Sequence, residues 1–146
     1  MANVSPLRAE FAKSKLDKVH ILRGNAEELA VFKLKNTAEL CTVETGEVDQ
    51  IHYQGEYMVV ENGHSMMAKV IATGCALGAL ITALATKTTS PAVASIAALL
   101  WYGVAGELAA KVIEQKSGGP GSFAVAFIDM LHEVNEDELR QYARLK

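Results

Sequence analysis

Two long stretches in the second half of the chain contain no charged side chain, and they restrict the possible folds more than any other feature. Residues 70–86 and 88–106 are rich in alanine, glycine, serine and threonine. Such stretches are buried either in a protein core or in a membrane. Trp101 and Tyr102 stand together on one side, so no aromatic belt brackets the two stretches. The composition therefore favours closely packed core helices over a membrane hairpin that turns at residues 88–91, and no membrane association is expected.

The rest of the composition indicates a single globular domain. The chain has 146 residues and a formal net charge of −3, without a cluster of lysine and arginine, so no nucleic-acid partner is expected. The N-terminal segment lacks the apolar run of a secretory signal. We therefore expect a cytoplasmic protein in which Cys41 and Cys75 are free thiols.

The order of predicted elements is typical of an α/β fold. Apolar runs and turn residues predict strands at 19–22 and 40–44 and an antiparallel hairpin over 48–60. Capping and periodicity predict helices at about 26–32, 73–86, 91–115 and 122–131, and a last helix after Asn135, which forms a capping pair with Glu138. This order predicts one domain over residues 1–146, with a mostly parallel sheet, an attached antiparallel hairpin and several C-terminal helices.

The segment at residues 69–76 is the first candidate site. Small residues lead into the first turn of a helix, where free backbone N–H groups and the helix dipole favour an anion such as phosphate. Gly74 lets a phosphate approach closely, and Cys75 stands where the helix start favours a thiolate that can accept a hydroxyl proton. The alternative is a tight helix start with Cys75 as a buried core thiol.

A second candidate site follows the strand at 19–22. Arg23 can pair with phosphate oxygens, and Asn25 and Glu28 share one helix face at a spacing of i, i+3. A carboxylate there can hold the Mg²⁺ of MgATP through water. The alternative is structural: Asn25 caps the helix, and Glu27 and Glu28 complement its dipole.

Further candidates lie in turns. Thr45 follows the strand at 40–44 and can donate to a phosphate, or it serves only the turn with Gly46. His64, in the turn at 62–64, is more often a structural loop residue than a base. The loop at 118–122 flanks an adenine or is only a loop. The cysteines and histidines lack zinc spacing, and there is no G-x-x-x-x-G-K-[ST] phosphate loop.

Taken in order, these motifs resemble the hydroxyethylthiazole kinase family over about residues 20 to 131. The resemblance rests on six segments: Arg23-Gly24-Asn25-Ala26-x-Glu28, Thr45-Gly46-Glu47-Val48-Asp49, Asn62-Gly63-His64, Lys69-Val70-x-x-Thr73-Gly74-Cys75, Tyr102-Gly103-Val104-Ala105-Gly106-Glu107 and Gly119-Pro120-Gly121-Ser122-Phe123.

The resemblance implies a ribokinase-like three-layer fold. It also implies a trimer with sites at subunit interfaces, and MgATP-dependent phosphorylation of the primary alcohol of 4-methyl-5-(2-hydroxyethyl)thiazole, a thiamine precursor. Arg23 and Thr45 match positions that bind ATP, and Gly74 belongs to the anion hole. Asn25 and Glu28 match an N-x-x-E element linked to magnesium and phosphate. Cys75 matches the position near the attacking hydroxyl, where many relatives carry a catalytic aspartate.

The sequence also departs from the family pattern. The family usually reads K-V-T-G-x-G-C, whereas Ile71 and Ala72 replace the threonine and the first glycine here. Ala72 matches a glycine that lies against the thiazole, and its methyl group would crowd the substrate, or the backbone if the position needs a positive φ. The family's N-terminal half has no counterpart in the sequence. We therefore expect either that another chain completes a truncated fold or that the homologue is non-catalytic, acting as a nucleotide-binding or oligomerisation module.

Overall fold

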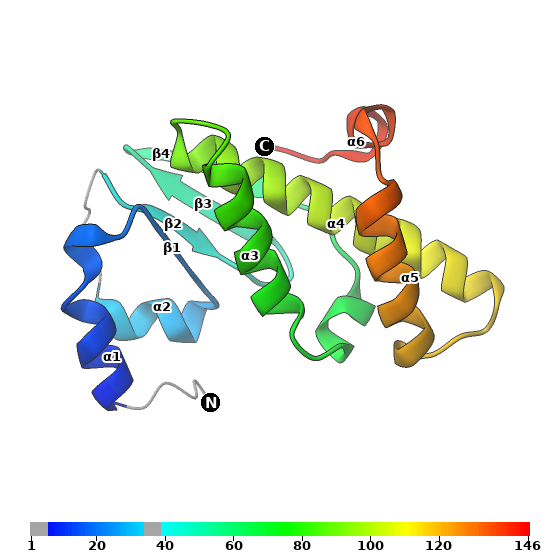
Figure 1. Cartoon of the computed structure of the whole chain (residues 1–146), viewed down its shortest axis with the longest axis horizontal. Coiled ribbons are helices and arrows are strands. Elements are labelled where there is room, and N and C mark those ends of the chain that lie inside the picture. The colour runs from blue at the N-terminus through cyan, green and yellow to red at the C-terminus, as the bar shows by residue number, and fades with distance from the viewer. Residues whose placement is uncertain (1–5, 34–38) are drawn as a thin grey trace.

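The computed structural model describes residues 6–33 and 39–146. Its centre is a four-stranded sheet in the order β1-β2-β3-β4, in which each strand pairs with its neighbour in sequence (Figure 1). The strands are β1 (Ile21–Gly24), β2 (Cys41–Glu44), β3 (Asp49–Tyr53) and β4 (Glu56–Val60). Each lies within about two residues of its predicted position, so the predicted strands are confirmed.

The sheet is mixed. The pair β1–β2 is parallel, whereas β2–β3 and β3–β4 are antiparallel. The prediction of a mostly parallel sheet is therefore wrong for the described residues, although the parallel pair and the attached hairpin are both present. The hairpin closes through Gln54 and Gly55, which have φ values of 52° and 85°. Two positive φ angles match the twist of the flanking strands, which is why such turns join tight hairpins.

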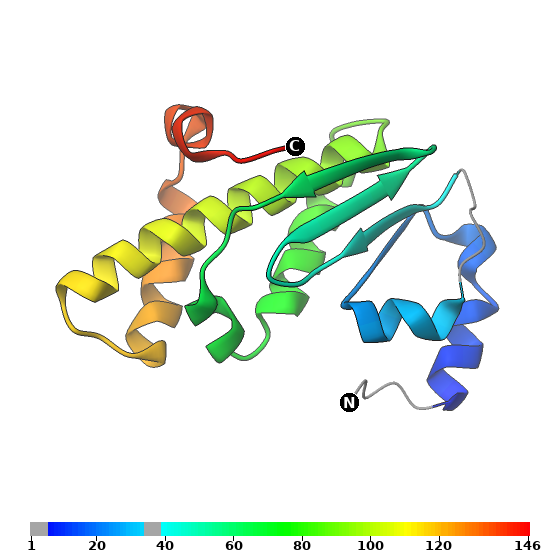
Figure 2. The same ribbon diagram turned by 180° about the vertical axis from the view of Figure 1, so that it is seen from behind.

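Two helices from the charge-free stretches cover one face of the sheet: α3 (Thr73–Ala85) and α4 (Pro91–Gln115). Figures 1 and 2 show both on the same side of the strands. Helix α4 starts with a Ser90 cap followed by Pro91 at its first position, as predicted. It contacts β2, β3 and β4, and Leu99 and Val104 on it are buried. The face of the sheet beneath α4 is apolar, since Val43 and Ile51 are fully buried.

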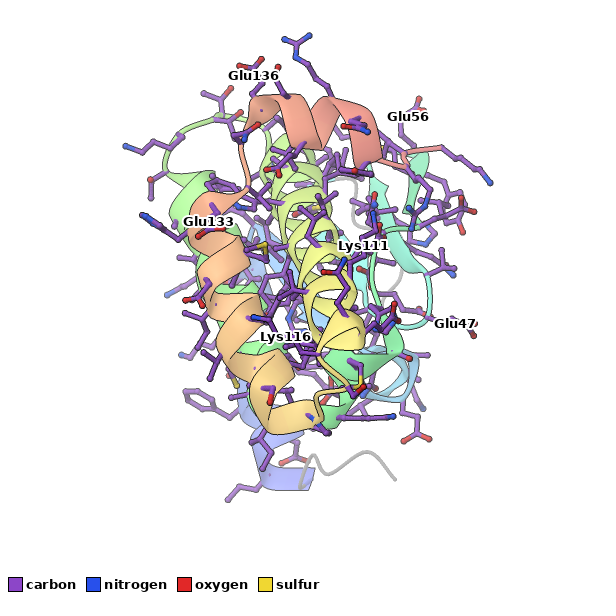
Figure 3. All side chains as sticks on the ribbon, turned by 90° about the vertical axis from the view of Figure 1, so that its right-hand side faces the viewer. Glu47, Glu56, Lys111, Lys116, Glu133 and Glu136 are labelled. Carbon is purple, nitrogen blue, oxygen red and sulfur yellow. The ribbon has the colours of Figure 1, made fainter. Side chains whose placement is uncertain are left out.

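By length and composition alone, α4 is apolar enough to cross a membrane. It is, however, surrounded by protein: it packs against α3, the sheet and α5 (Pro120–Glu133). Figure 3 shows α4 and α5 side by side, with Lys111 in the C-terminal part of α4 and Lys116 directly after its last residue. The fold thus accounts for this stretch as the central helix of the core.

A further layer lies on the opposite side of β1. A Cβ atom added to Gly24 would stand 3.1 Å from Glu28 Cβ and 3.4 Å from Leu29 Cδ2, both on α2 (Ala26–Phe32). Because side chains alternate along a strand, Arg23 points to the other side, toward α3. Helix α2, the sheet and the pair α3–α4 therefore form the three layers of an α/β fold. Helix α1 (Pro6–Lys13) packs on α2, and a 3-10 helix, η1 (Leu16–Lys18), leads into β1.

The C-terminal helices follow the predicted capping with one exception. Helix α5 begins at Pro120 with Gly119 as its N-cap, two residues before the start predicted at about residue 122. Proline at the first helical position needs no N–H partner, and this allows the earlier start. Helix α6 (Glu136–Tyr142) opens with the predicted capping box between Asn135 and Glu138. A 3-10 helix, η2 (Ser65–Lys69), joins β4 to α3.

Candidate functional site

A cleft of about 980 Å³ opens where β1 and β2 end, between those ends, residues 62–68 and the N-terminus of α3. The carboxyl ends of parallel strands are where open α/β sheets bind ligands. Five of the predicted site residues line the cleft together: Arg23, Asn25, Glu28, Thr45 and Gly74. Leu77, Leu99 and Met67 give it an apolar floor. The structure thus gathers residues from positions 23 to 103 of the sequence into one cleft.

Arg23 and the start of α3 face each other in the cleft. A Cβ at Gly74 would stand 3.4 Å from Nη2 and 3.5 Å from Nη1 of Arg23, and one at Gly78 would stand 3.9 Å from Nε. Because Gly74 and Gly78 have no side chains, the guanidinium can pack directly against the helix backbone. An arginine fork and a helix N-terminus both attract an anion, so their meeting point is suited to a phosphate group.

The first turn of α3 begins at Ala72, which has φ 70° and ψ 6°, the left-handed region. The first backbone bond of the helix runs from the Ala76 N–H to the Ala72 carbonyl, at 3.0 Å. The amides of residues 73–75 precede that bond and are the free donors of a helix start. Ala72 thus has the positive φ at which a methyl group is expected to strain the backbone. A left-handed alanine costs about 1–2 kcal/mol relative to a right-handed one.

Tyr102 anchors this helix start from α4. Its hydroxyl donates to the Thr73 carbonyl at 2.7 Å, and the Thr73 hydroxyl donates to the carbonyls of Met67 and Val70 at 3.2 and 3.3 Å. Burial raises the pKa of Tyr102 to about 12, although Arg23 acts to lower it. The phenol is thus protonated at neutral pH and remains a donor. These bonds fix the direction in which the free amides of α3 point.

Asn25 and Glu28 form a complete capping box on α2. The Glu28 N–H donates to Asn25 Oδ1 at 2.9 Å, and the Asn25 N–H donates to Glu28 Oε2 at 2.9 Å. The structural alternative considered for these residues is therefore confirmed. The box leaves Glu28 Oε1 and the Asn25 amide nitrogen for a ligand. Among the described residues no group of three or more His, Cys, Asp or Glu side chains is arranged to hold a metal ion. A magnesium ion that keeps its waters and binds mainly through phosphates fits this donor set.

Asp49 is a cleft residue to which the sequence assigned no role, although it ends the motif at residues 45–49. Its Oδ1 accepts from the Gly46 N–H at 3.0 Å and fixes the turn that presents Thr45. Thr45 Oγ1 donates to the Gly24 carbonyl at 3.4 Å, which ties the same turn to β1. Burial raises the pKa of Asp49 to about 6, against the lowering effects of the Gly46 bond and of Arg23.

The turn at residues 62–64 forms another wall of the cleft. Asn62 is 5% exposed, and His64 caps η2 by accepting from the Met66 N–H at 3.3 Å. The Gly63 N–H donates to Glu107 Oε1 at 2.8 Å. A Cβ at Gly103 would lie 2.5 Å from the Cβ of Asn62, so only glycine lets this turn rest on α4. The histidine therefore has the structural role that the sequence favoured.

Cys75 and Ala72 do not line the cleft, and both are exposed beside it. The alternative of a buried core thiol is therefore wrong for Cys75. The buried thiol is Cys41, whose sulfur lies 3.8 Å from Ser95 Oγ. Burial raises the pKa of Cys41, partly offset by that hydrogen bond. The loop at residues 118–122 does not line the cleft either, so its suggested place beside an adenine stays a prediction.

The fold and the cleft define a three-layer α/β protein with an anion-accepting cleft at the ends of its parallel strands. The profile of the hydroxyethylthiazole kinase family matches residues 30–137. This chain belongs to that family.

Individual relatives agree with this assignment. The chain is 32% identical to the probable hydroxyethylthiazole kinase of Agrobacterium fabrum over 151 residues, covering 98% of this chain and 59% of the relative. It is 40% identical to hydroxyethylthiazole kinase 1 of Streptococcus pneumoniae over 107 residues, covering 71% of this chain and 40% of the relative. A solved structure of a hydroxyethylthiazole kinase protein from Pyrococcus horikoshii superposes with a TM-score of 0.83 at 28% identity, covering 99% of this chain and 61% of that one. The chain thus spans about half the length of the curated relatives it matches.

Proposed function

We propose that this chain is the nucleotide-binding half of a hydroxyethylthiazole kinase, spanning residues 1–146 as one unit. The proposed reaction transfers the γ-phosphoryl group of ATP, with Mg²⁺, to the primary alcohol of 4-methyl-5-(2-hydroxyethyl)thiazole, as in thiamine biosynthesis. The observation that supports it most is the contact of the Arg23 guanidinium with the first turn of α3 at Gly74. Phosphoryl transfer depends on positioning and charge stabilisation, and this contact offers both.

In this proposal each cleft residue has a separate task. Arg23, Thr45 and the free amides around Gly74 hold phosphate oxygens. The Asn25 amide nitrogen, which the capping box leaves unused, donates to a phosphate. Glu28 Oε1 would accept from a water of the magnesium ion, while Oε2 stays in the box. The magnesium ion would neutralise charge on the phosphates.

Cys75 is proposed to lie at the acceptor alcohol. It is the third residue of α3, directly after Gly74 of the proposed anion hole, and its side chain is exposed. The hydroxyl oxygen attacks the γ-phosphorus as the bond to the leaving ADP oxygen breaks, and the hydroxyl proton passes to the sulfur of Cys75. Ala72 would border the thiazole, where its methyl group narrows the available space.

We further propose a cytoplasmic assembly in which other subunits complete the fold, either as a homotrimer or with a partner chain. Large apolar side chains remain on the surface, including Leu7 at 77%, Phe11 at 66% and Ile71 at 95% exposure. Ile71 lies next to Ala72, at the position proposed for the thiazole. A second subunit that covers Ile71 would also close the substrate site.

The second candidate is a non-catalytic homologue that acts as a nucleotide-binding or oligomerisation module. Its supporting observation is Ala72, whose left-handed backbone and extra methyl group stand where the family usually has glycine. This candidate keeps the phosphate contacts of Arg23 and Gly74 but transfers no phosphoryl group.

The test is ATP turnover by size-characterised protein with and without hydroxyethylthiazole, combined with binding of labelled ATP. Thiazole-dependent ADP formation that falls in Cys75→Ala, with ATP binding retained, would support the kinase. ATP binding without turnover would favour the module. A folded protein that neither binds nor turns over ATP would contradict the kinase and the nucleotide-binding module, and would leave only a role in oligomerisation.

A further inference from the structure

The C-terminal segment, residues 144–146, pairs with the outer edge of β4. The Val59 N–H donates to the Lys146 carbonyl at 2.8 Å, and the Lys146 N–H donates back at 2.9 Å. The Glu61 N–H donates to the Arg144 carbonyl at 3.0 Å. Figures 1 and 2 both show the chain end running beside β4. The segment lies beyond the residues that the family profile matches, and it reaches the point where the chain leaves β4 for the cleft wall at residues 62–64.

Arg144 makes a two-pronged ion pair with Glu107 of α4. Its Nη2 lies 2.6 Å from Oε1 and its Nη1 lies 3.1 Å from Oε2. The same Oε1 accepts from the Gly63 N–H at 2.8 Å and from Asn62 Nδ2 at 3.1 Å. The Glu107 side chain is only 15% exposed, so the charge that binds Gly63 is held away from water. Forked arginine–carboxylate bonds fix geometry as well as charge.

Asn62 joins the same network from the other side. Its Oδ1 accepts from the Arg144 N–H at 2.7 Å, and its Nδ2 donates to the Tyr142 carbonyl at 2.9 Å as well as to Glu107. With three bonds made, the buried Asn62 amide is committed to holding the turn and is not available to a ligand in the cleft. Asn62 lines the cleft together with Gly63 and His64, so the network holds this wall of the cleft from behind.

The partly buried carboxylate of Glu107 stays ionised because the Arg144 guanidinium stabilises its negative charge. Burial by itself would raise the pKa of Glu107, but the bonds from Arg144, Gly63 and Asn62 outweigh it and lower the pKa below its ordinary value. Removing Arg144 would leave a carboxylate with little water and fewer donors. Such a group either takes up a proton or rotates toward solvent, and both changes weaken its hold on the Gly63 amide.

We infer that Arg144 is a positioning residue for the cleft: acting through Glu107, it holds the Gly63–His64 wall at the distance from Arg23 that a bound nucleotide requires. The identity of the ligand rests on the proposed function, whereas the positioning of the wall does not. The C-terminal segment is then part of the binding apparatus, although none of its own side chains lines the cleft.

The experiment compares Arg144→Met with two controls. Lys146→Met removes a cation from the same segment, but its partner is Glu61 and it does not touch Glu107. Val134→Ala truncates a core residue that does not line the cleft, and it serves as a reference for lost stability. MgADP affinity is measured by calorimetry, and amide exchange of Gly63 is measured by NMR on all four proteins. Arg144→Lys is added because it restores the charge without the fork.

We expect Arg144→Met to weaken MgADP binding at least tenfold and to speed Gly63 exchange at least tenfold. Lys146→Met and Val134→Ala should change either quantity less than twofold, and Arg144→Lys should lie between. Equal losses in Arg144→Met and in Val134→Ala would overturn the inference, because lost stability would explain both. If the wild-type protein binds no MgADP, the proposed function fails, and the Gly63 exchange rates alone decide the inference by the same comparison.

Discussion

The guanidinium of Arg23 lies on the α-carbon of Gly74, so that a methyl group at position 74 would stand 3.4 Å from Nη2. This contact joins the end of β1 to the first turn of α3, two segments about fifty residues apart. Both partners carry positive potential toward the cleft, one from the side chain and the other from the helix N-terminus. Two such groups side by side repel each other until an anion lies between them. An anion bound between them would relieve this repulsion, and the contact therefore supports the phosphate site proposed above.

Replacing Arg23 with methionine should lower the affinity for MgADP by at least about tenfold, which corresponds to about 1.4 kcal/mol. The aliphatic part of the side chain still covers Gly74, so the fold should persist. Arg140→Met is the matched control, since Arg140 forms an exposed ion pair with Glu136 within α6 and does not line the cleft. Calorimetric titration checks the affinities. Equal binding by both variants would show that Arg23 does not contact the nucleotide.

Ala72→Gly should stabilise the protein by about 0.5–1 kcal/mol. The left-handed φ of 70° strains alanine, and glycine removes that strain, although it also raises the entropy of the unfolded chain. Ala76→Gly, one turn into the same helix, is the control and should destabilise by about 0.5–1 kcal/mol. Urea unfolding measures both changes. Opposite signs are expected, and a loss of stability in both variants would contradict the assigned backbone geometry.

The capping patterns of the sequence predicted most helix boundaries, because caps are local. Helix α4 starts at Pro91 after Ser90, and helix α6 starts after Asn135, both as predicted. The pairing directions of the strands were harder to predict from the sequence. They depend on which strands become neighbours, and a sequence pattern of alternating residues looks the same in parallel and antiparallel pairs. The proportion of parallel pairing was therefore overestimated.

The site shows a different limit. Asn25 and Glu28 are spaced i, i+3, and this one spacing serves both a capping box and a pair of ligand groups, so the sequence left the choice open. The exposure of Cys75 was open for a similar reason. Its helix is apolar on most of its surface, so no periodic pattern indicates which face is buried. The contact between Glu107 and Arg144 joins residues 37 positions apart, and no local signal announces it.

The stability of the protein should depend on pH through Asp49. Its folded-state pKa, raised by burial to about 6, lies above the ordinary value of 3.8. Its stabilising contribution is therefore complete below about pH 4 and is lost as the pH rises through about 6. Asp49→Asn keeps an acceptor for the Gly46 N–H without the charge. The variant should gain about 1–3 kcal/mol over wild type at pH 8 and nothing at pH 4.

Urea unfolding of wild type and Asp49→Asn at pH 4, 6 and 8 checks this dependence. Asp17→Asn is a suitable control, because Asp17 lies in η1 and does not line the cleft. A stability difference that is the same at pH 4 and pH 8 would show that Asp49 titrates normally.

The two thiols should react at different rates with a disulfide reagent. Cys75 is exposed at the start of α3, whereas Cys41 is fully buried beneath α4. One equivalent should react within minutes in the folded protein, and the second only on unfolding. Cys75→Ala should abolish the fast phase, and saturating MgADP should slow it if nucleotide binds beside Gly74. A fast phase that survives in Cys75→Ala would mean that Cys41 is accessible.

Two glycines of α4 should respond in opposite ways to alanine. At Gly103 a Cβ would lie 2.5 Å from Asn62 Cβ and 2.7 Å from the Asn62 backbone, so the cleft wall itself must move. At Gly106 the added Cβ would meet the Met67 sulfur, the far part of a flexible side chain that can turn aside. Overpacking against backbone costs about 1–3 kcal/mol or more, whereas alanine in a helix gains about 1 kcal/mol over glycine.

Gly103→Ala should therefore destabilise by about 2 kcal/mol and weaken MgADP binding, because it displaces the Asn62–Gly63 turn. Gly106→Ala should stay within about 1 kcal/mol of wild type, since the helix gain offsets the methionine rearrangement. Thermal unfolding and calorimetric titration of both variants provide the measurement. If Gly106→Ala loses more stability than Gly103→Ala, the close approach of Asn62 to Gly103 is contradicted. If Gly103→Ala loses stability but keeps its affinity for MgADP, the turn at residues 62–64 does not contribute to nucleotide binding.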